Sequence, residues 1–179
     1  MILGLDVSTS ITGYTLLRKD GSICEIGHID LRKQKNFFDK ARSIRDATVA
    51  LDKRAPSWIQ HVYIEQSLQS FRSGFSSAHT LSLLSRFNGV VSWICSDFLH
   101  TDPQYIAAPS ARKVVGIKVP KGKKAKEVVM QFVIDNVPEF DVQYTRHGNP
   151  KPGYMDRADS YIIAKAGWLN ERQETQNTD

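Results

Sequence analysis

The sequence predicts a single α/β domain whose mixed five-stranded sheet has three antiparallel strands followed by parallel strands, with helices on its faces. Three observations support this fold class. Short apolar runs separated by tight turns fill the first 31 residues. Apolar residues then recur at helical spacing, and further on strand-like runs alternate with helix-like segments. Tight turns join antiparallel neighbours, whereas alternating strands and helices are typical of parallel sheets.

Three strands are expected at the start of the chain. Residues 2–7 form an apolar run that fits a buried strand, and residues 13–17 continue as a second strand. The Asp20-Gly21 pair is a strong signal for a tight hairpin turn. Residues 23–31 are therefore expected to run antiparallel to the second strand.

The remaining elements follow from periodicity and turn residues. We expect a helix from residue 37 to before Pro56, strands at 61–66 and 105–108, and helices at 78–97, 124–137 and 156–170. The last residues are polar, so 171–179 are expected to form a flexible tail after a single domain that spans 1–170. No internal repeat or inter-domain linker is visible.

Composition excludes several classes of protein. Hydrophobic residues make up 41% and charged residues 24% of the 179 residues, which is typical of a globular domain. No stretch approaches the roughly 18 apolar residues of a membrane span, and no secretory signal is visible. The two cysteines, Cys24 and Cys95, are too few for a disulfide framework or a cysteine zinc site. We therefore expect a cytoplasmic protein with reduced thiols.

Positive charge is concentrated in one segment. The net charge is +5, and no acidic residue lies between Pro103 and Lys126. The basic residues of that segment are Arg112, Lys113, Lys118, Lys121, Lys123, Lys124 and Lys126. Such clustering is typical of a surface that binds a polyanion, although a solvated basic face has the same composition.

Four acidic residues stand where an acid is unfavourable or geometrically paired. Asp6 interrupts the apolar run "ILGLDV", and Glu65 closes the strand "VYIE". Asp156 and Asp159 are three residues apart in "MDRADSYIIAKA", which places them on one face of a helix. A structural interpretation stays open for three of them: a surface position for Glu65, a helix cap for Asp156 and a dipole partner for Asp159. No such structural interpretation fits Asp6, because a charge within a buried strand is unfavourable unless a partner compensates it.

The four acids could gather at one end of the sheet. They would then repel one another, and bound cations would relieve that repulsion. Oxygen ligands of this kind select Mg²⁺ or Mn²⁺, and two such ions about 4 Å apart suit the hydrolysis of a phosphodiester.

Four segments of the chain resemble the RuvC family of Holliday junction resolvases, in the same order and over most of the sequence. They are "LGLDVSTSITGY", "YIEQSL", "PSARKVVGIKVPKGKKAKEVV" and "DRADSYIIAKA". The resemblance implies a ribonuclease H-like fold and a Mg²⁺-dependent endonuclease, with two ions per active site and Mn²⁺ able to substitute. It also implies that a homodimer resolves four-way DNA junctions by paired symmetric nicks. No motif identifies a helicase partner.

The same resemblance implies the roles of individual residues. The catalytic metal ligands would be Asp6, Glu65, Asp156 and Asp159. The family's catalytic lysine lies in a loop before a helix, and the lysines at that place are Lys121, Lys123, Lys124 and Lys126. Of these we favour Lys124. Contacts with the DNA backbone would come from Arg72, Arg86, Arg112, Lys113, Lys118 and the remaining lysines of that loop, Lys121, Lys123 and Lys126.

The chain departs from the family pattern at two positions. The family has an aromatic residue three positions after its glutamate, whereas Leu68 stands there in this chain. Phe71 and Phe75 are candidate substitutes that would contact DNA. Ser160 follows the last aspartate, where the family usually has alanine.

A homodimer would match the symmetry of the substrate. A four-way junction has two-fold symmetry, so two matched nicks require two active sites, which a C2 dimer supplies. The family's dimer interface lies on the helix after the glutamate, and the matching region, 77–98, contains Leu81, Leu84 and Phe87. The same pattern fits a core helix equally well.

Three alternatives stay open at this stage. A ribonuclease H-like nuclease that acts on other branched DNA or on RNA–DNA hybrids would use the same carboxylates. The segment "GLDVSTSITGY" also resembles the phosphate-binding hairpin of sugar kinases and actin-like ATPases, which have two related domains and far longer chains. A catalytically inert protein that binds junctions is the third.

Overall fold

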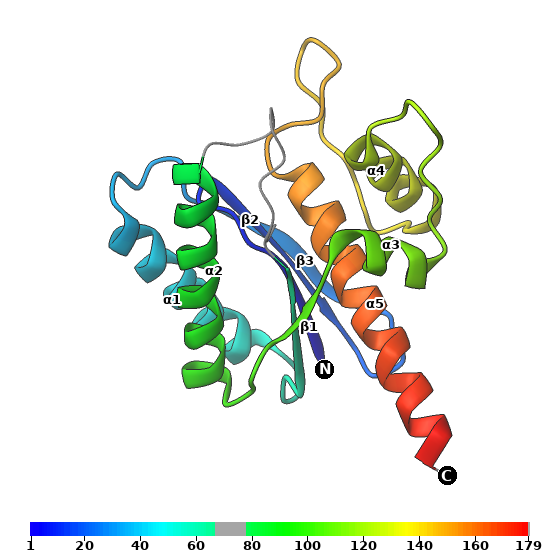
Figure 1. Ribbon diagram of the computed structural model, residues 1–179, viewed down its shortest axis with the longest axis horizontal. Coiled ribbons are helices and arrows are strands. Elements are labelled where there is room, and N and C mark those ends of the chain that lie inside the picture. The colour runs from blue at the N-terminus through cyan, green and yellow to red at the C-terminus, as the bar shows by residue number, and fades with distance from the viewer. Residues whose placement is uncertain (67–77, 179) are drawn as a thin grey trace.

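A five-stranded mixed sheet forms the centre of the molecule (Figure 1). The computed structural model describes residues 1–66 and 78–178 of the chain. The strands are β1 (Ile2–Asp6), β2 (Ile11–Leu17), β3 (Ile23–Asp30), β4 (His61–Glu65) and β5 (Gln104–Ile106). Their spatial order is β3-β2-β1-β4-β5; β2 is antiparallel to β1 and to β3, whereas β4 is parallel to β1 and to β5. The mixed sheet predicted from the sequence is confirmed.

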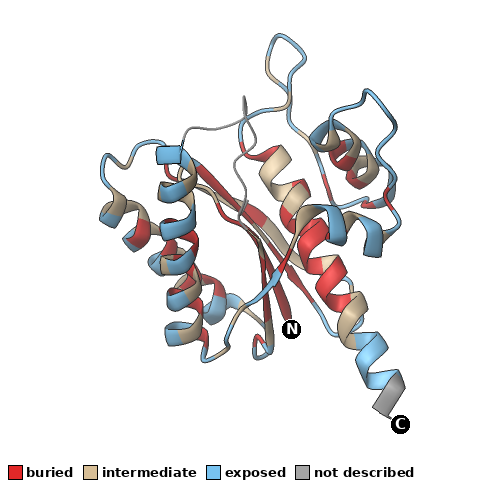
Figure 2. Cartoon of the chain, in the orientation of Figure 1, coloured by how far each residue is buried: buried red, intermediate tan, exposed pale blue. Residues whose placement is uncertain are grey.

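Helices cover both faces of the sheet (Figure 1). α1 (Phe37–Arg54) and α2 (Ala78–Leu99) pack together on one face, and α5 (Tyr154–Thr178) crosses the other. α3 (Ala108–Val115) and α4 (Ala125–Asn136) pack against α5. Figure 2 shows buried residues on the strands and on parts of the helices that cover them. Among the described residues, the buried apolar side chains form two clusters, one on each side of the sheet. Within the described part of the chain, no helix is long and apolar enough to cross a membrane.

The sequence pattern predicts no helix at residues 108–115, yet α3 forms there. Pro109 fits the first turn of a helix, where its missing N–H is not needed. Gly116 ends the helix in a left-handed conformation with φ 87°. Ala111 is the buried residue of this short helix, so its apolar periodicity is too weak to indicate a helix.

The final helix is longer than the sequence pattern predicts. Residues 171–178 continue α5, whereas the sequence pattern places the end of the helix near residue 170. Glu171 accepts a hydrogen bond from the Tyr63 hydroxyl of β4 and lies 3.0 Å from Nδ1 of His61. These contacts with a distant strand hold the helix in place, and the polarity of the segment gives no sign of them.

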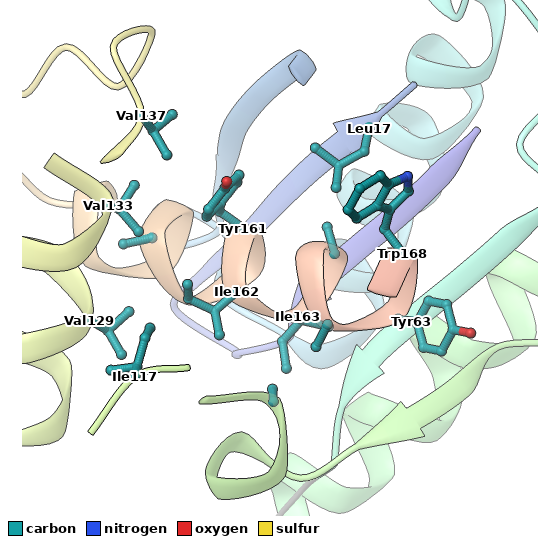
Figure 3. Close-up of a cluster of buried hydrophobic side chains, with 14 of the residues drawn as sticks. Leu17, Tyr63, Ile117, Val129, Val133, Val137, Tyr161, Ile162, Ile163 and Trp168 are labelled. Atoms are coloured by element: carbon teal, nitrogen blue, oxygen red, sulfur yellow. The ribbon is translucent and has the colours of Figure 1, made fainter. Parts of the chain in front are cut away.

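Side chains along β1 alternate between the two clusters. Leu3 and Leu5 belong to the cluster beneath α1 and α2, whereas Ile2 belongs to the cluster beneath α5. Because side chains alternate along a strand, Gly4 and Asp6 share the face of Ile2. Figure 3 shows the apolar cluster on this α5 side of the sheet. Asp6 therefore stands at the end of an apolar face that α5 covers.

Two glycines let α5 lie very close to the sheet. A Cβ atom on Gly4 of β1 would lie 2.5 Å from the backbone nitrogen of Ala164. A Cβ atom on Gly13 of β2 would lie 1.9 Å from the carbonyl oxygen of Asp156. Gly13 is also the cross-strand partner of Asp6. The first turn of α5 is therefore seated against the strand pair that carries Asp6.

A buried hydroxyl pair joins the same surfaces. Oγ1 of Thr15 on β2 and Oγ of Ser160 on α5 are 2.9 Å apart, and both residues are fully buried. Ser160 donates its proton to the carbonyl oxygen of Arg157 at 2.8 Å, so Thr15 is the donor within the pair. A serine in place of the usual alanine is thus accommodated without an unsatisfied buried hydroxyl.

We expect Gly13→Ala to lower the thermal unfolding temperature, because the new methyl group would push the first turn of α5 away from β2. Overpacking of this kind costs about 1–3 kcal/mol and occasionally more. Gly89→Ala on α2 is the matched control, since its Cβ atom would meet nothing within 4 Å. The control should unfold at the same temperature or slightly higher, because alanine favours a helix over glycine. An unchanged unfolding temperature for Gly13→Ala would contradict the close contact.

Candidate active site

The ends of two parallel strands bring the first two acids together. Asp6 is the last residue of β1, and Glu65 is the last residue of β4. Because the strands are parallel and Leu5 pairs with Ile64, the two acids occupy neighbouring positions at the same edge of the sheet. Asp6 is 9% exposed, and Glu65 is partly buried. Two carboxyl groups are therefore held side by side with little access to water.

The first turns of α5 add the other two acids. Asp156 and Asp159 lie on the part of α5 that Gly13 allows to approach the sheet, and the Asp159 side chain is 13% exposed. Burial raises the pKa of Asp6 well above its ordinary value, and the charges of the three other acids raise it further. The four acids that the sequence pattern singles out therefore converge on one site.

The pKa of Glu65 is shifted by the same causes as that of Asp6, burial and nearby acids. Burial, followed by the charge of Asp159, raises the pKa of Glu65 to about 7, while Lys126 and Arg112 act in the opposite direction. Burial also raises the pKa of Asp159 against the influence of Lys126. Buried acids that repel one another and have raised pKa values are typical of functional sites.

Asn88 supports this site and was not among the residues expected from the sequence. It is a buried residue of α2, and its side-chain amide donates to the carbonyl oxygen of Glu65 at 3.1 Å. The backbone N–H of Gln66 donates to the carbonyl oxygen of Ile106 at 3.0 Å. Together these bonds fix the end of β4. The available signal was an asparagine beside Phe87 within the apolar pattern of α2.

One lysine lies directly at the carboxylates, and it is Lys126. Its ammonium nitrogen is 3.2 Å from Oδ2 of Asp159. Burial lowers the pKa of Lys126, but the charges of Asp159 and Asp6 outweigh burial, so the net shift is upward. Lys126 is therefore a cation held within the acidic site.

Lys124, which the sequence analysis favours, does not reach the carboxylates. Its side chain is 83% exposed and pairs with Glu127 of α4 at 3.1 Å. Lys124 is the residue before the first turn of α4, whereas Lys126 lies within that turn on the side that faces α5. Two positions along a helix change the direction of a side chain by about 200°, and this difference decides which lysine meets Asp159.

Solved structures with a similar fold exist, although no family model and no curated protein matches the chain. Thermus thermophilus RuvC in complex with Holliday junction substrate has a TM-score of 0.67 and 13% identity, and the match covers 97% of this chain and 96% of that chain. The chain has the RuvC fold. Another Thermus thermophilus RuvC structure has a TM-score of 0.64 and 15% identity, with coverage of 97% and 96%. The yeast mitochondrial Holliday junction resolvase Ydc2 has a TM-score of 0.58 and 15% identity, with coverage of 99% and 82%.

The RuvC fold confirms the ribonuclease H-like architecture predicted from the sequence. Identities of 13% and 15% establish the fold alone. The match with the first of these structures extends over 97% of this chain.

The acidic site of this RuvC fold suits a divalent cation of the magnesium type. Carboxylates supply the hard oxygen atoms that Mg²⁺ prefers. A cation would offset the burial and the mutual repulsion that raise the pKa values of Asp6, Glu65 and Asp159. Within residues 1–66 and 78–178, no three His, Cys, Asp or Glu side chains already stand in a metal-binding arrangement. The Lys126 ammonium pairs with Asp159 instead. In the described structure, Asp159 is thus paired with a lysine at the position where it would hold a metal ion.

The predicted DNA contacts fall into four groups. Arg112 on α3 lies near the site, because its charge acts on both Glu65 and Asp159. The lysines with exposed side chains along the same basic segment are Lys113, Lys118, Lys121 and Lys123. Arg86 is exposed on α2 beside an apolar groove. The remaining candidates lie outside the described residues: Phe71, Arg72 and Phe75, together with Leu68.

We expect Lys126→Ala to tighten the binding of Mn²⁺ to the DNA-free protein, because the substitution removes a cation that competes for Asp159. A partly exposed ion pair of this kind contributes up to about 1 kcal/mol, which corresponds to a gain of about two- to five-fold in affinity. Mn²⁺ binding can be measured by electron paramagnetic resonance. Lys124→Ala is the matched control and should leave the affinity unchanged. Weaker Mn²⁺ binding by Lys126→Ala would contradict the competition.

Proposed function

We propose that this protein is a Mg²⁺-dependent endonuclease that resolves four-way DNA junctions by paired symmetric nicks. The observation that carries the proposal is the convergence of Asp6, Glu65, Asp156 and Asp159 at one edge of the sheet, with Lys126 among them. The RuvC fold supports the same conclusion, because Thermus thermophilus RuvC has been solved with a Holliday junction substrate. The basic segment on α3 and α4 adds a surface suited to the phosphate backbone.

The carboxylates would act as the ligands of the metal ions. When bound, two Mg²⁺ ions, for which Mn²⁺ could substitute, supply an activated water molecule and neutralise charge on the leaving oxygen. The charges of Glu65, Asp159 and Asp156 all act on Asp6, so Asp6 would be the central ligand of the metal site. Once Lys126 leaves Asp159, its ammonium group would neutralise charge that develops on the scissile phosphate. Lys126 rather than Lys124 is therefore the proposed catalytic lysine.

Cleavage assays test this function directly. Labelled four-way junction, Y-fork, linear duplex and RNA–DNA hybrid should be incubated with the protein, with and without Mg²⁺. We expect paired symmetric nicks in the junction that depend on the metal. Asp6→Asn should reduce cleavage by at least about a hundred-fold, because it would remove a carboxylate that holds the metal, yet it should retain junction binding. Preferential cleavage of the Y-fork or the hybrid would favour the alternative nuclease, and metal-independent cleavage would contradict both.

The face formed by α1 and α2 is the proposed dimer interface. An apolar groove of about 640 Å³ lies there, and its lining residues include Phe38, Val90 and Trp93. Phe38 is 68% exposed and Trp93 is 62% exposed. Phe87, which the sequence analysis placed among the candidate interface residues, is instead fully buried in the core. Exposed aromatic side chains that line an apolar groove suit a protein interface, and a second copy would supply the second active site.

We expect Trp93→Ser to convert the dimer to a monomer in light-scattering measurements, because the substitution removes an exposed anchor from the groove. Nicks in a four-way junction should then lose their pairing, since two independent monomers cut at different times. Trp58→Ser is the matched control, because Trp58 is also 62% exposed but lies outside the groove. The dimer proposal is wrong if both variants have the mass of the parent protein, or if the parent is itself a monomer.

A further inference from the structure

Residues 143–151 form a short hairpin, here named the 143–151 hairpin, which has no role in the site described so far. Tyr144 and Pro150 form an antiparallel bridge. The backbone N–H of Thr145 donates to Asn149 at 2.7 Å, and that of Lys151 donates to Gln143 at 2.8 Å. The segment is therefore an ordered projection with hydrogen bonds of its own.

The charge of this hairpin is entirely basic. No acidic residue lies between Asp141 and Asp156, whereas Arg146, His147 and Lys151 lie between them. Arg146 donates to the His147 ring at 3.0 Å, and Lys151 donates to the Gln143 side chain at 3.1 Å. Neither cation pairs with a carboxylate of the described chain.

Some arginines elsewhere in the protein differ from the one in the hairpin, because they pair with carboxylates. On α1, Arg42 pairs with Asp39 at 2.7 Å and Arg45 pairs with Asp46 at 2.7 Å. Those charges are neutralised by the protein itself, whereas the exposed charges of the 143–151 hairpin are available to an external anion. A phosphate backbone is the anion that this protein is proposed to meet.

The base of the hairpin is fixed to the turn that carries Asp156. A Cβ atom on Gly153 would lie 2.6 Å from the His28 ring, so this residue packs tightly against β3. Arg157 donates to Nδ1 of His28 at 2.8 Å and stacks over the Tyr154 ring at 4.6 Å. Figure 1 shows the hairpin projecting beyond the amino end of α5, at the end of the molecule away from both termini. Its distance from the carboxylates is therefore set by the same contacts that hold α5.

The protein thus has two basic surfaces beside one acidic site. The segment on α3 and α4 packs along the side of α5, whereas the 143–151 hairpin extends beyond the end of that helix. A linear duplex that follows the first surface across the carboxylates need not touch the second. At a branch point, however, a second duplex arm leaves from the position of the scissile phosphate.

We propose that Arg146 and Lys151 of the 143–151 hairpin bind the phosphate backbone of a second DNA arm and thereby favour branched DNA over linear duplex. This inference rests on the proposed function and adds a binding surface to it. The contacts are to phosphates, so they recognise the shape of the substrate and carry no base sequence.

Binding measurements in an inactive background test the proposal. Asp6→Asn protein should be titrated with a labelled four-way junction and with a linear duplex, by fluorescence anisotropy over a series of salt concentrations. Adding Arg146→Ala and Lys151→Ala should weaken junction binding by about ten-fold near 0.1 M salt and lower the salt slope by about two, as expected for two lost phosphate contacts. Duplex binding should change less than about two-fold.

The control variant carries Lys19→Ala and Lys53→Ala in the same background, because these exposed lysines lie near the opposite end of the sheet. It should bind both substrates as the parent does. Equal losses for junction and duplex, or no loss for either, would overturn the proposal. Arg146→Gln alone removes the charge but keeps a polar side chain, and it serves if the double variant unfolds. Failure of the proposed function appears separately, as a parent protein that binds the junction no more tightly than the duplex.

Discussion

The close contact between α5 and the β1–β2 strand pair is the constraint on which the acidic site depends. Gly4 and Gly13 leave no side chain between the helix and the sheet, so the backbone of α5 touches the strands themselves. Acids on the helix can then reach the ends of β1 and β4. A larger residue at either glycine would separate the two pairs of carboxylates, which come from opposite ends of the chain and share no local structure.

The acidic cluster itself opposes folding. Burial and mutual repulsion both disfavour the ionised carboxylates, as the raised pKa values of Asp6 and Glu65 indicate. Lys126 offsets part of this unfavourable charge through its ion pair with Asp159. The remainder is supported by the apolar clusters on both sides of the sheet. A bound cation would offset this unfavourable negative charge. The burial of the carboxylates therefore connects the packing of the domain with its proposed chemistry.

The sequence pattern predicted the features that are determined by residues close together in the chain. The Asp20-Gly21 turn, the alternation in β1 and the i, i+3 spacing of Asp156 and Asp159 carry their own signals. The RuvC fold over 97% of the chain favours the nuclease interpretation over the kinase-like one. Where the structure departs from the sequence pattern, the causes are tertiary. The final turns of α5 depend on Tyr63 and His61, which lie more than a hundred residues earlier. The choice of Lys126 over Lys124 depends on where α4 begins, which periodicity leaves uncertain by one or two residues.

The bond between Tyr63 and Glu171 has a mechanical consequence for the far end of the molecule. It ties α5 to β4 about 22 Å along the helix axis from Asp156. A helix that contacts the sheet at two separated points rotates less than one that contacts it at a single point. Loss of the Tyr63–Glu171 bond would let α5 rotate about its contacts with Gly4 and Gly13. A rotation of a few degrees would displace Asp156 and Asp159, so a residue far along the helix helps to fix their positions.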